Sequence, residues 1–292
     1  MVKSGFLVIN KKKGITSFDV VRLAKKKLGT KKIGHTGTLD PQTDGVLVLA
    51  IEDATKYIPI ISETKQKTYR AKMKFGEHRD TYDVEGTVTK TDDKVIDTET
   101  AKAALLSFVG KYDQYPPIYS AKKVNGKRLY DYAREGIEVE IKPSEVEIID
   151  FPYIGEVIDN EIEFEVVVSK GTYIRSLIVD VATKLETVAY MSDLTRTKSD
   201  GFSISDAILE EDMTPELIID FNQYLLGKYP KIEVYGKIEK LARNGFGFRP
   251  LEGATYPLLY TTQEGTPIAL YQKLNDGATK PLIMIKDRSE NN

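Results

Sequence analysis

Apolar and polar residues alternate along two segments of the chain, 68–75 and 162–168. A period of two is the pattern of a strand that buries one face. In the first segment, Tyr69 shares its face with the apolar residues at positions 71, 73 and 75, while threonine, arginine and lysine occupy the other face. A third segment, Val46–Ile51, is apolar without interruption and predicts a short buried strand.

Helical spacing of apolar residues occurs where the chain also carries helix start and stop signals. Thr16–Asp19 has the form of a capping box, and the apolar stripe behind it stops at Gly29, which predicts a helix over 17–28. The same spacing predicts three more helices: 101–108, 174–185, and a segment that begins at Thr214-Pro215 and ends at Gly227.

A boundary between two domains is expected at Lys228-Tyr229-Pro230, which separates residues 1–228 from residues 231–292. Beyond this linker, turn signals at Asn244-Gly245 and Asn275-Asp276-Gly277 between short strands predict a compact, β-rich module. Strands and helices of the larger domain are interleaved irregularly. This order predicts an α+β domain rather than a regular βαβ wind.

Composition excludes several kinds of site. The 292 residues contain no cysteine and only two histidines, His35 and His78, so cysteine-ligated metals, disulfides and multi-histidine metal centres are excluded. The longest apolar run is far shorter than the roughly 20 residues of a membrane span, and the N-terminus lacks the apolar core of a signal peptide. We therefore expect a cytoplasmic protein.

Charge is nearly balanced overall, with 42 basic and 44 acidic residues, but it is segregated along the chain. Residues 1–34 hold ten Lys or Arg and one acid, whereas residues 135–165 hold eleven acids and one lysine. Blocks of one sign also occur as solvated faces of ordinary helices and strands. Because a basic block creates a local potential that attracts polyanions, the pattern suggests a phosphate-rich partner.

The loop Gly34–Pro41 is the strongest candidate for chemistry. Its two glycines permit a tight backbone and Pro41 stiffens the residues after it, so Asp40 is held just ahead of a buried strand. Loops of this kind fix a carboxylate at the edge of a scaffold. Two alternatives remain on the residues alone: an Asp-Pro turn in which Asp40 caps its own backbone, which they favour, and an acid/base pair of Asp40 with Asp44.

Four motifs occur one after another in the chain: Gly34–Pro41, Lys67-Thr68-Tyr69, Tyr115–Ala121 and Ser169–Arg175. Together they resemble the TruB family, the bacterial tRNA pseudouridine synthases that act on the uridine at position 55 of the T-loop. The resemblance covers roughly residues 5–203. It implies an α+β, mixed-sheet pseudouridine synthase domain, followed by a small PUA-like RNA-binding domain that matches only loosely.

The resemblance also implies the catalytic residues. Asp40 would be the nucleophile, or the carboxylate that initiates glycosidic cleavage, and Arg175 would pair with it. Tyr69 would stack on the target base and serve in proton transfer; by its pattern alone it is also a core residue. Because substrate and product are isomers, the reaction implies no cofactor and no metal.

Substrate-binding residues are implied by the same resemblance. His35 would insert into the T-loop and take the place of the flipped base, while Tyr173 and Leu194 would line the uracil pocket. The partner would be the T-arm of tRNA, with the basic N-terminal segment on its phosphates. We expect a monomer that binds no membrane.

The sequence departs from the family pattern at several positions. Lys12-Lys13-Gly14 lacks the usual proline, Thr195 stands where an arginine is common, and Asp44 adds a negative charge after the catalytic loop. Tyr190 replaces a usual histidine. None of these removes a catalytic position, but the changes at Asp44 and Thr195 are expected to weaken RNA binding.

Two other functions fit the scaffold. One is a non-catalytic RNA-binding or tRNA-folding protein, against which the intact set of Asp40, Tyr69 and Arg175 argues. The other is a sibling synthase that modifies another RNA. A phosphate-binding metabolic enzyme is remote, because the chain has no P-loop or GxGxxG motif.

Overall fold

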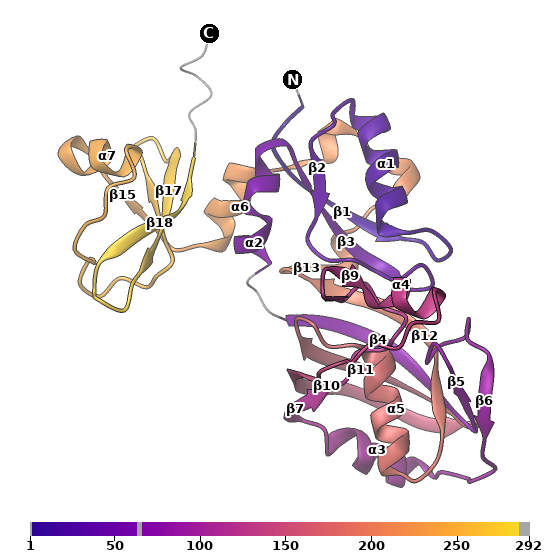
Figure 1. Cartoon of the computed structure of the whole chain (residues 1–292). Helices are drawn as coiled ribbons and strands as arrows, with labels where there is room; N and C mark the ends of the chain where they lie inside the picture. Colours follow the sequence, from indigo (N-terminus) through magenta and orange to yellow (C-terminus); the bar gives the residue numbers. More distant parts are fainter. Residues whose placement is uncertain (1, 63–65, 286–292) are drawn as a thin grey trace.

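The computed structural model describes residues 2–62 and 66–285, which form a large mixed-sheet domain and a smaller β module (Figure 1). Ten described strands make the large sheet, eight of them in the order β14-β1-β3-β12-β4-β11-β10-β7. They are β14 (Ile219–Asp220), β1 (Gly5–Lys11), β3 (Asp44–Ile51), β12 (Ala189–Ser199), β4 (Gln66–Phe75), β11 (Glu161–Ser169), β10 (Ser144–Ile158) and β7 (Gly110–Gln114), with β2 (Ile33–His35) beside β3 and β13 (Phe202–Ser203) beside β12.

The sheet is mixed because β12 and β3 pair in parallel whereas the other described pairs in it are antiparallel. This confirms the α+β, mixed-sheet expectation. The parallel contact is short, joining Thr195 to Asp44 and Arg196 to Gly45. It nevertheless brings the middle of β12 against the start of β3, directly beside the Gly34–Pro41 loop.

Helices cover the sheet on both faces. Helix α1 (Ser17–Leu28) packs on one face of β1 and β3, and their other face packs on α2 (Ile58–Ile61), α6 (Phe221–Lys228) and part of the C-terminal module. Since both faces of β3 are covered, its apolar run has no polar interruptions. Helices α3 (Thr98–Leu106) and α5 (Ile174–Lys184) cover β4, β11 and β12.

Two small hairpins project from the sheet beside the loop after β2 (Figure 1). One is β5 (Glu77–Arg79) with β6 (Val88–Thr91), whose connecting turn contains Asp83. The other is β8 (Lys123–Val124) with β9 (Lys127–Arg128), followed by the short helix α4 (Leu129–Arg134). Short 3₁₀ turns, η1 (Glu52–Tyr57), η2 (Ile204–Asp206), η3 (Glu210–Asp212) and η4 (Pro215–Leu217), complete the connections.

The C-terminal module is a four-stranded sheet with one short helix. Its strands are β15 (Lys231–Glu233), β16 (Leu258–Thr261), β17 (Pro267–Lys273) and β18 (Thr279–Met284), and its helix is α7 (Gly236–Arg243). Leu259, Leu270 and Ile283 of this sheet pack in one core cluster with Phe221 and Leu225 of α6. The module thus rests on α6, and the boundary at residues 228–230 stays a prediction.

One helix prediction was wrong. Thr214-Pro215 begins only the 3₁₀ turn η4, after which the chain forms β14 and pairs with the edge of β1. The helix α6 begins later because the Asp220 side chain accepts hydrogen bonds from the backbone amides of Asn222 and Gln223. The edge of β1 and this aspartate cap, rather than the proline, decide where the helix begins.

The Asn244-Gly245 signal also differs from its expectation, because it ends α7 instead of joining two strands. By contrast, the helix over 17–28 is confirmed with both hydrogen bonds of its capping box and with Gly29 in the left-handed conformation. None of the described helices is long and apolar enough to cross a membrane.

Candidate active site

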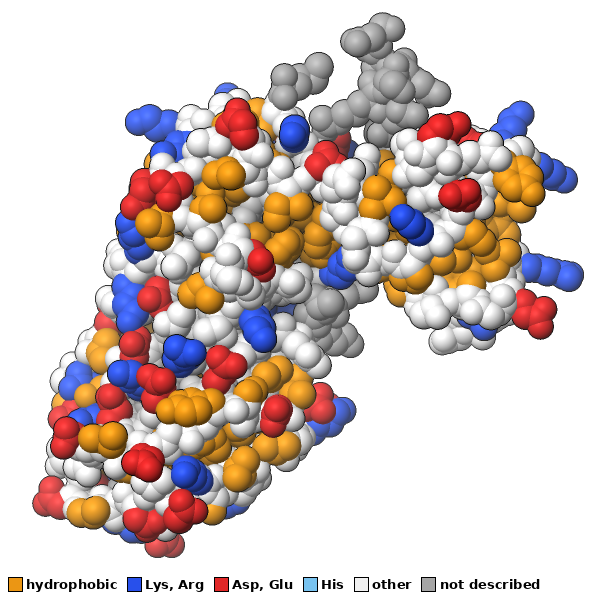
Figure 2. Space-filling model, turned by 180° about the vertical axis from the view of Figure 1, so that it is seen from behind, with side chains coloured by type: hydrophobic (Ala, Val, Ile, Leu, Met, Phe, Trp, Pro, Cys, Tyr) orange, Lys and Arg blue, Asp and Glu red, His pale blue; other side chains and the backbone are white. Residues whose placement is uncertain are grey.

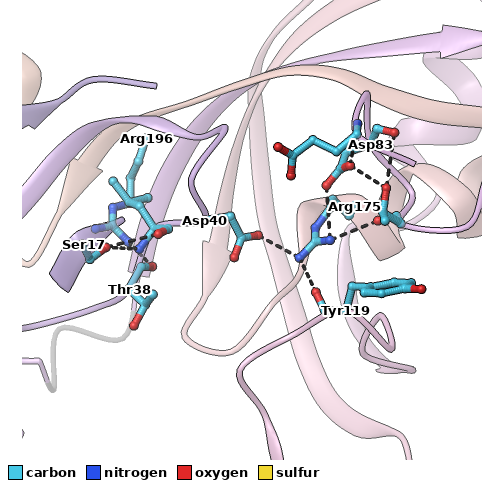
Figure 3. Close-up of polar contacts among 10 residues, drawn as sticks. Ser17, Thr38, Asp40, Asp83, Tyr119, Arg175 and Arg196 are labelled. Atoms are coloured by element: carbon cyan, nitrogen blue, oxygen red, sulfur yellow. Dashed lines mark hydrogen bonds and ion pairs between the residues drawn. The ribbon is translucent and has the colours of Figure 1, made fainter. Parts of the chain in front are cut away.

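The loop between β2 and β3 carries Asp40, and hydrogen bonds to neighbouring elements hold its backbone (Figure 3). The Ser17 hydroxyl at the start of α1 accepts from the Leu39 amide at 2.8 Å and donates to the Leu39 carbonyl at 3.1 Å. From β12, Arg196 donates to the carbonyls of Gly37, at 3.1 Å, and Thr38, at 3.4 Å. The backbone that leads to Asp40 is therefore fixed from two sides.

A buried lysine fixes the other end of the loop. The Lys11 ammonium donates to the carbonyls of Pro41, at 3.2 Å, Ile15, at 2.8 Å, and Lys12, at 3.0 Å. Burial lowers the pKa of Lys11 to about 8, although nearby carboxylates partly oppose the shift. Asp40 therefore sits on a loop whose conformation does not have to form when a ligand arrives.

Asp40 turns its side chain away from its own backbone and toward Arg175. A turn does exist here, since the Thr43 amide donates to the Asp40 carbonyl at 3.0 Å. The side chain does not cap it: Oδ2 accepts from Nη2 of Arg175 at 2.8 Å and 46 % of the side chain stays exposed. Asp44 is no partner of this site, because its carboxylate accepts from Thr195 at 2.6 Å.

Arg175 is the buried centre of the site, with only 6 % of its side chain exposed (Figure 3). Nη2 donates to Asp40 and to the carbonyl of Tyr119, at 3.0 Å, while Nη1 donates to the Thr81 carbonyl at 3.0 Å and to Asp83 at 3.2 Å. Asp83 is itself 9 % exposed. One guanidinium therefore joins the loop that carries Asp40 to the β5–β6 turn and to the segment after β7.

The β5–β6 turn is built to present Asp83. Its Oδ1 accepts from the Thr81 hydroxyl at 2.6 Å and from the Glu85 amide at 3.1 Å, which leaves Oδ2 for Arg175. Position 86 has no space for a side chain, because a methyl group there would lie 2.4 Å from the Thr81 hydroxyl oxygen. A glycine is therefore required. Residues 81–86 thus hold Asp83 as a second carboxylate partner of Arg175.

A pocket of about 480 Å³ opens at the exposed side of Asp40. Five of the six site residues expected from the sequence line it: Asp40, Tyr69, Tyr173, Arg175 and Leu194. Tyr69 also packs against the main core cluster, so its ring belongs both to the core and to the wall of the pocket; its role in stacking and proton transfer stays a prediction. Burial raises the pKa of Tyr173, which keeps its hydroxyl protonated.

His35 is the sixth expected residue, and it is not among the residues that line the pocket. It lies in β2, opposite Leu49 of β3. Burial, followed by the charge of Arg196, lowers the pKa of His35, so the imidazole is neutral at pH 7. Among the described residues, none gives its buried Nδ1 a hydrogen bond.

Three charged residues support the site although sequence analysis assigned them no role: Lys67, Asp83 and Arg196. Only Lys67 lies within one of the four motifs, and the partners of all three are distant in the chain, such as the Thr38 carbonyl for Arg196. The residue pattern around them gave no signal of these contacts. In the part of the chain that the structure describes, no group of three or more His, Asp or Glu side chains could hold a metal ion.

Lys67 gives a testable pH dependence of stability. Burial, followed by the charge of Arg196, lowers the pKa of Lys67 from 10.5 to about 8. Between these two pKa values the lysine of the unfolded chain binds more protons than the lysine of the folded chain. The free energy of unfolding therefore rises with pH across this range, and this gain is lost as the pH falls to 8. We expect wild type to gain about 1.5 kcal/mol over Lys67→Met between about pH 8 and 9.5, measured by urea unfolding. A difference that does not change with pH would contradict the burial of this charge.

The fold of this chain matches solved structures over nearly its whole length. It is similar to a chain of "Crystal Structure of a Cbf5-Nop10-Gar1 Complex", with a TM-score of 0.67, 21% identity, and coverage of 97% of this chain and 84% of that chain. A second match is "Structure of H/ACA RNP bound to a substrate RNA containing 2'-deoxyuridine", with a TM-score of 0.67, 20% identity, and coverage of 97% and 86%. The protein thus shares its fold with a chain of each of these complexes, and it pairs a carboxylate with a guanidinium at its pocket.

Sequence comparison gives the family. The model of the TruB family pseudouridylate synthase (N terminal domain) matches residues 25–174. A protein of Clostridium tetani called tRNA pseudouridine synthase B is 41% identical over 290 residues, covering 94% of this chain and 97% of that protein. Its namesake in Geobacillus thermodenitrificans is 38% identical over 305 residues, covering 97% and 99%. This chain belongs to the TruB family of pseudouridylate synthases.

Proposed function

We propose that this protein is a tRNA pseudouridine synthase that isomerises the T-loop uridine at position 55, with Asp40 as the group that acts first. The observation that carries the proposal is the Asp40–Arg175 pair of 2.8 Å at the mouth of a pocket lined by Tyr69 and Tyr173. The relatives of C. tetani and G. thermodenitrificans, named for this activity, support the substrate class.

The reaction needs one carboxylate and a place for a base to turn. The N1–C1′ glycosidic bond breaks, the uracil rotates and C5 bonds to C1′. C5 then loses its proton and N1 takes up a proton, so that the product is an isomer of the substrate and the conjugation of the uracil ring is restored. Attack on the sugar, attack on the base and assistance to a glycal all begin at the same carboxylate. Arg175 orients Asp40 for that step, because its guanidinium donates a hydrogen bond to Oδ2 of the carboxylate.

A base inside a folded T-loop is not accessible to Asp40, so the nucleotide has to leave its stack at a cost of a few kcal/mol. The pocket of about 480 Å³ has room for the extruded base, with Leu194 and Tyr69 on its walls. An aromatic ring that fills the vacated position returns about 1–3 kcal/mol. His35 is assigned this position, and its lowered pKa suits stacking because a neutral imidazole has no charge to desolvate.

The partner in this proposal is the T-arm of tRNA. Lys12 and Lys13 of the basic N-terminal segment form exposed ion pairs with Glu211 and Asp193. Exposed pairs are worth little, so RNA phosphates can replace these acids. The face in Figure 2 mixes acidic and basic side chains over the larger domain, so it offers a polyanion no surface of a single sign. We further propose that the C-terminal module binds RNA and that the enzyme acts as a cytoplasmic monomer.

The test uses purified protein, an unmodified tRNA transcript and no added cofactor. Pseudouridine is mapped by carbodiimide modification and reverse-transcription stops. We expect one new stop, at the T-loop uridine. Tight binding without any stop would instead favour an RNA-folding protein, and stops only in another RNA would favour a sibling synthase.

Tyr69→Phe is expected to fold normally and to slow product formation by about 100-fold or more, the range of a lost proton-transfer group. The ring remains to pack against the core and to stack on the base, so tRNA affinity should change little. Single-turnover assays and filter binding measure the two effects separately. A rate equal to wild type would remove the hydroxyl from the proton-transfer role.

A further inference from the structure

Lys67 places a buried cation behind the loop that carries Asp40. Its ammonium donates to the Ser199 hydroxyl at 2.8 Å and lies 3.5 Å from Oδ2 of Asp200. Only 11 % of the Lys67 side chain and 1 % of the Asp200 side chain are exposed. The ammonium is therefore held in one position by two residues at the end of β12.

The same carboxylate oxygen is tied to the start of the catalytic loop. Oδ2 of Asp200 accepts from the hydroxyls of Thr36, at 2.5 Å, and Ser199, at 2.8 Å. Thr36 directly precedes Gly37, the first loop residue that Arg196 also binds. One polar cluster thus joins β4, β12 and the loop.

Close packing connects Lys67 with Gly37 itself. A methyl group placed on Gly37 would lie 3.0 Å from Nζ and 3.5 Å from Cε of Lys67, and 3.5 Å from Nη1 of Arg196. A methyl group at this distance is closer than an ordinary van der Waals contact, so Nζ of Lys67 or the loop would have to move by a few tenths of an ångström. Ser199 and Asp200 hold the ammonium and oppose that movement.

The cluster contains two cations, Lys67 and Arg196, against the single carboxylate of Asp200. Burial of an excess charge is costly, and apolar side chains of similar size would avoid that cost. Lys67 bears this cost in its lowered pKa. Such an arrangement at the edge of a reaction pocket indicates a task for the cation beyond stability.

We propose that Lys67 is a positioning residue for Asp40: its ammonium, held by Ser199 and Asp200, packs against Gly37 and fixes the loop conformation that presents Asp40 to Arg175. The inference rests on the proposed function. Lys67 lines the pocket with the 11 % of its side chain that is exposed, but Ser199 and Asp200 hold its ammonium, so the proposal assigns its effect to the contact with the loop and not to a contact with substrate.

The first test compares Lys67→Met with a control on the same strand, Lys74→Met, which lies outside the pocket. We expect Lys67→Met to lower the single-turnover rate constant for pseudouridine formation by about 10- to 100-fold, the effect of a displaced catalytic group. The tRNA Kd and its salt dependence should stay within about 3-fold of wild type, because no phosphate contact is lost. Lys74→Met should behave as wild type.

The second test is a double-mutant cycle with Gly37→Ala. Alone, this change should slow the reaction, since the new methyl meets Nζ. In the Lys67→Met background Nζ is absent, so adding Gly37→Ala should change the rate by less than about 3-fold, a coupling expected only for residues in contact. Equal effects of Gly37→Ala in both backgrounds would overturn the proposal.

Two controls distinguish a failure of the positioning role from misfolding of the variant and from a failure of the proposed function. Lys67→Met leaves Asp200 with one cation fewer, so if that variant does not fold, Lys67→Met with Asp200→Asn removes both charges while the amide oxygen still accepts from Thr36 and Ser199. This double variant should fold and should still form pseudouridine slowly. A rate constant equal to that of wild type would overturn the positioning role of Lys67, and so would a loss of tRNA affinity with no change in that rate constant. A wild-type protein that makes no pseudouridine would contradict the proposed function instead.

Discussion

Asp40→Asn is expected to abolish pseudouridine formation, with a loss of at least about 1,000-fold in the single-turnover rate constant, the scale seen when a central catalytic group is removed. Asparagine has the shape of aspartate and its oxygen still accepts from Arg175. It lacks the negative charge and the nucleophilic oxygen. Because Ser17, Arg196 and Lys11 hold the loop backbone, tRNA affinity should stay within about 3-fold of wild type.

The matched control is Asp44→Asn, four residues further on. Asp44 bonds to Thr195 and does not line the pocket, so its amide variant should retain the wild-type rate. Product formation is followed by carbodiimide stops on T-loop transcripts and affinity by filter binding. If Asp40→Asn lost affinity as strongly as rate, Asp40 would be a structural residue; if both variants were active, the chemistry would lie elsewhere.

Arg175→Lys is expected to have the second largest effect, a loss of about 100-fold or more in rate together with reduced stability. The guanidinium serves four acceptors from three segments, at distances of 2.8–3.2 Å. A single ammonium keeps the charge but cannot reach Asp40 and Asp83 while also serving the carbonyls of Thr81 and Tyr119. The buried acceptors left unpaired should lower the free energy of unfolding by about 1–3 kcal/mol.

The slower reaction and the lower stability expected for Arg175→Lys are measured separately. Single-turnover assays measure the first, and urea unfolding of the same protein measures the second. Arg22→Lys, an exposed arginine on α1 that pairs with Asp19, is the control and should alter neither. If the Arg175→Lys protein were less stable but reacted at the wild-type rate, Arg175 would have only a structural role. Another group would then have to orient Asp40.

The sequence predicted those elements whose signals are local. Thr16 and Asp19 exchange hydrogen bonds across a single turn, so the start of α1 could be recognised without any knowledge of the rest of the fold. The alternation in β4 was equally reliable, because its apolar residues all face one core. The start of α6 could not be predicted in this way, because the residues that follow the Thr214-Pro215 signal include strand β14, which pairs with β1 instead of continuing a helix.

Two departures from the family pattern also could not be interpreted correctly without the tertiary structure. Asp44 and Thr195 each looked like a change that weakens RNA binding. In the folded chain they lie opposite one another in the parallel β3–β12 pair and share a hydrogen bond of 2.6 Å. The two changes therefore form one local interaction, and the weakening of RNA affinity stays a prediction.

The sequence alone was enough for the elements with local signals and for the family pattern of motifs. The pairing of the charged residues depended on the tertiary structure. Arg175 lies 135 residues from Asp40 and 92 from Asp83, and Arg196 lies 158 from the Thr38 carbonyl. Charges so far apart in the chain meet because β12 pairs with the start of β3 and because the β5–β6 turn bridges to β12 through Asp83 and Met191. Once they are buried there, the low local dielectric makes every unpaired charge costly, so that the partners become fixed.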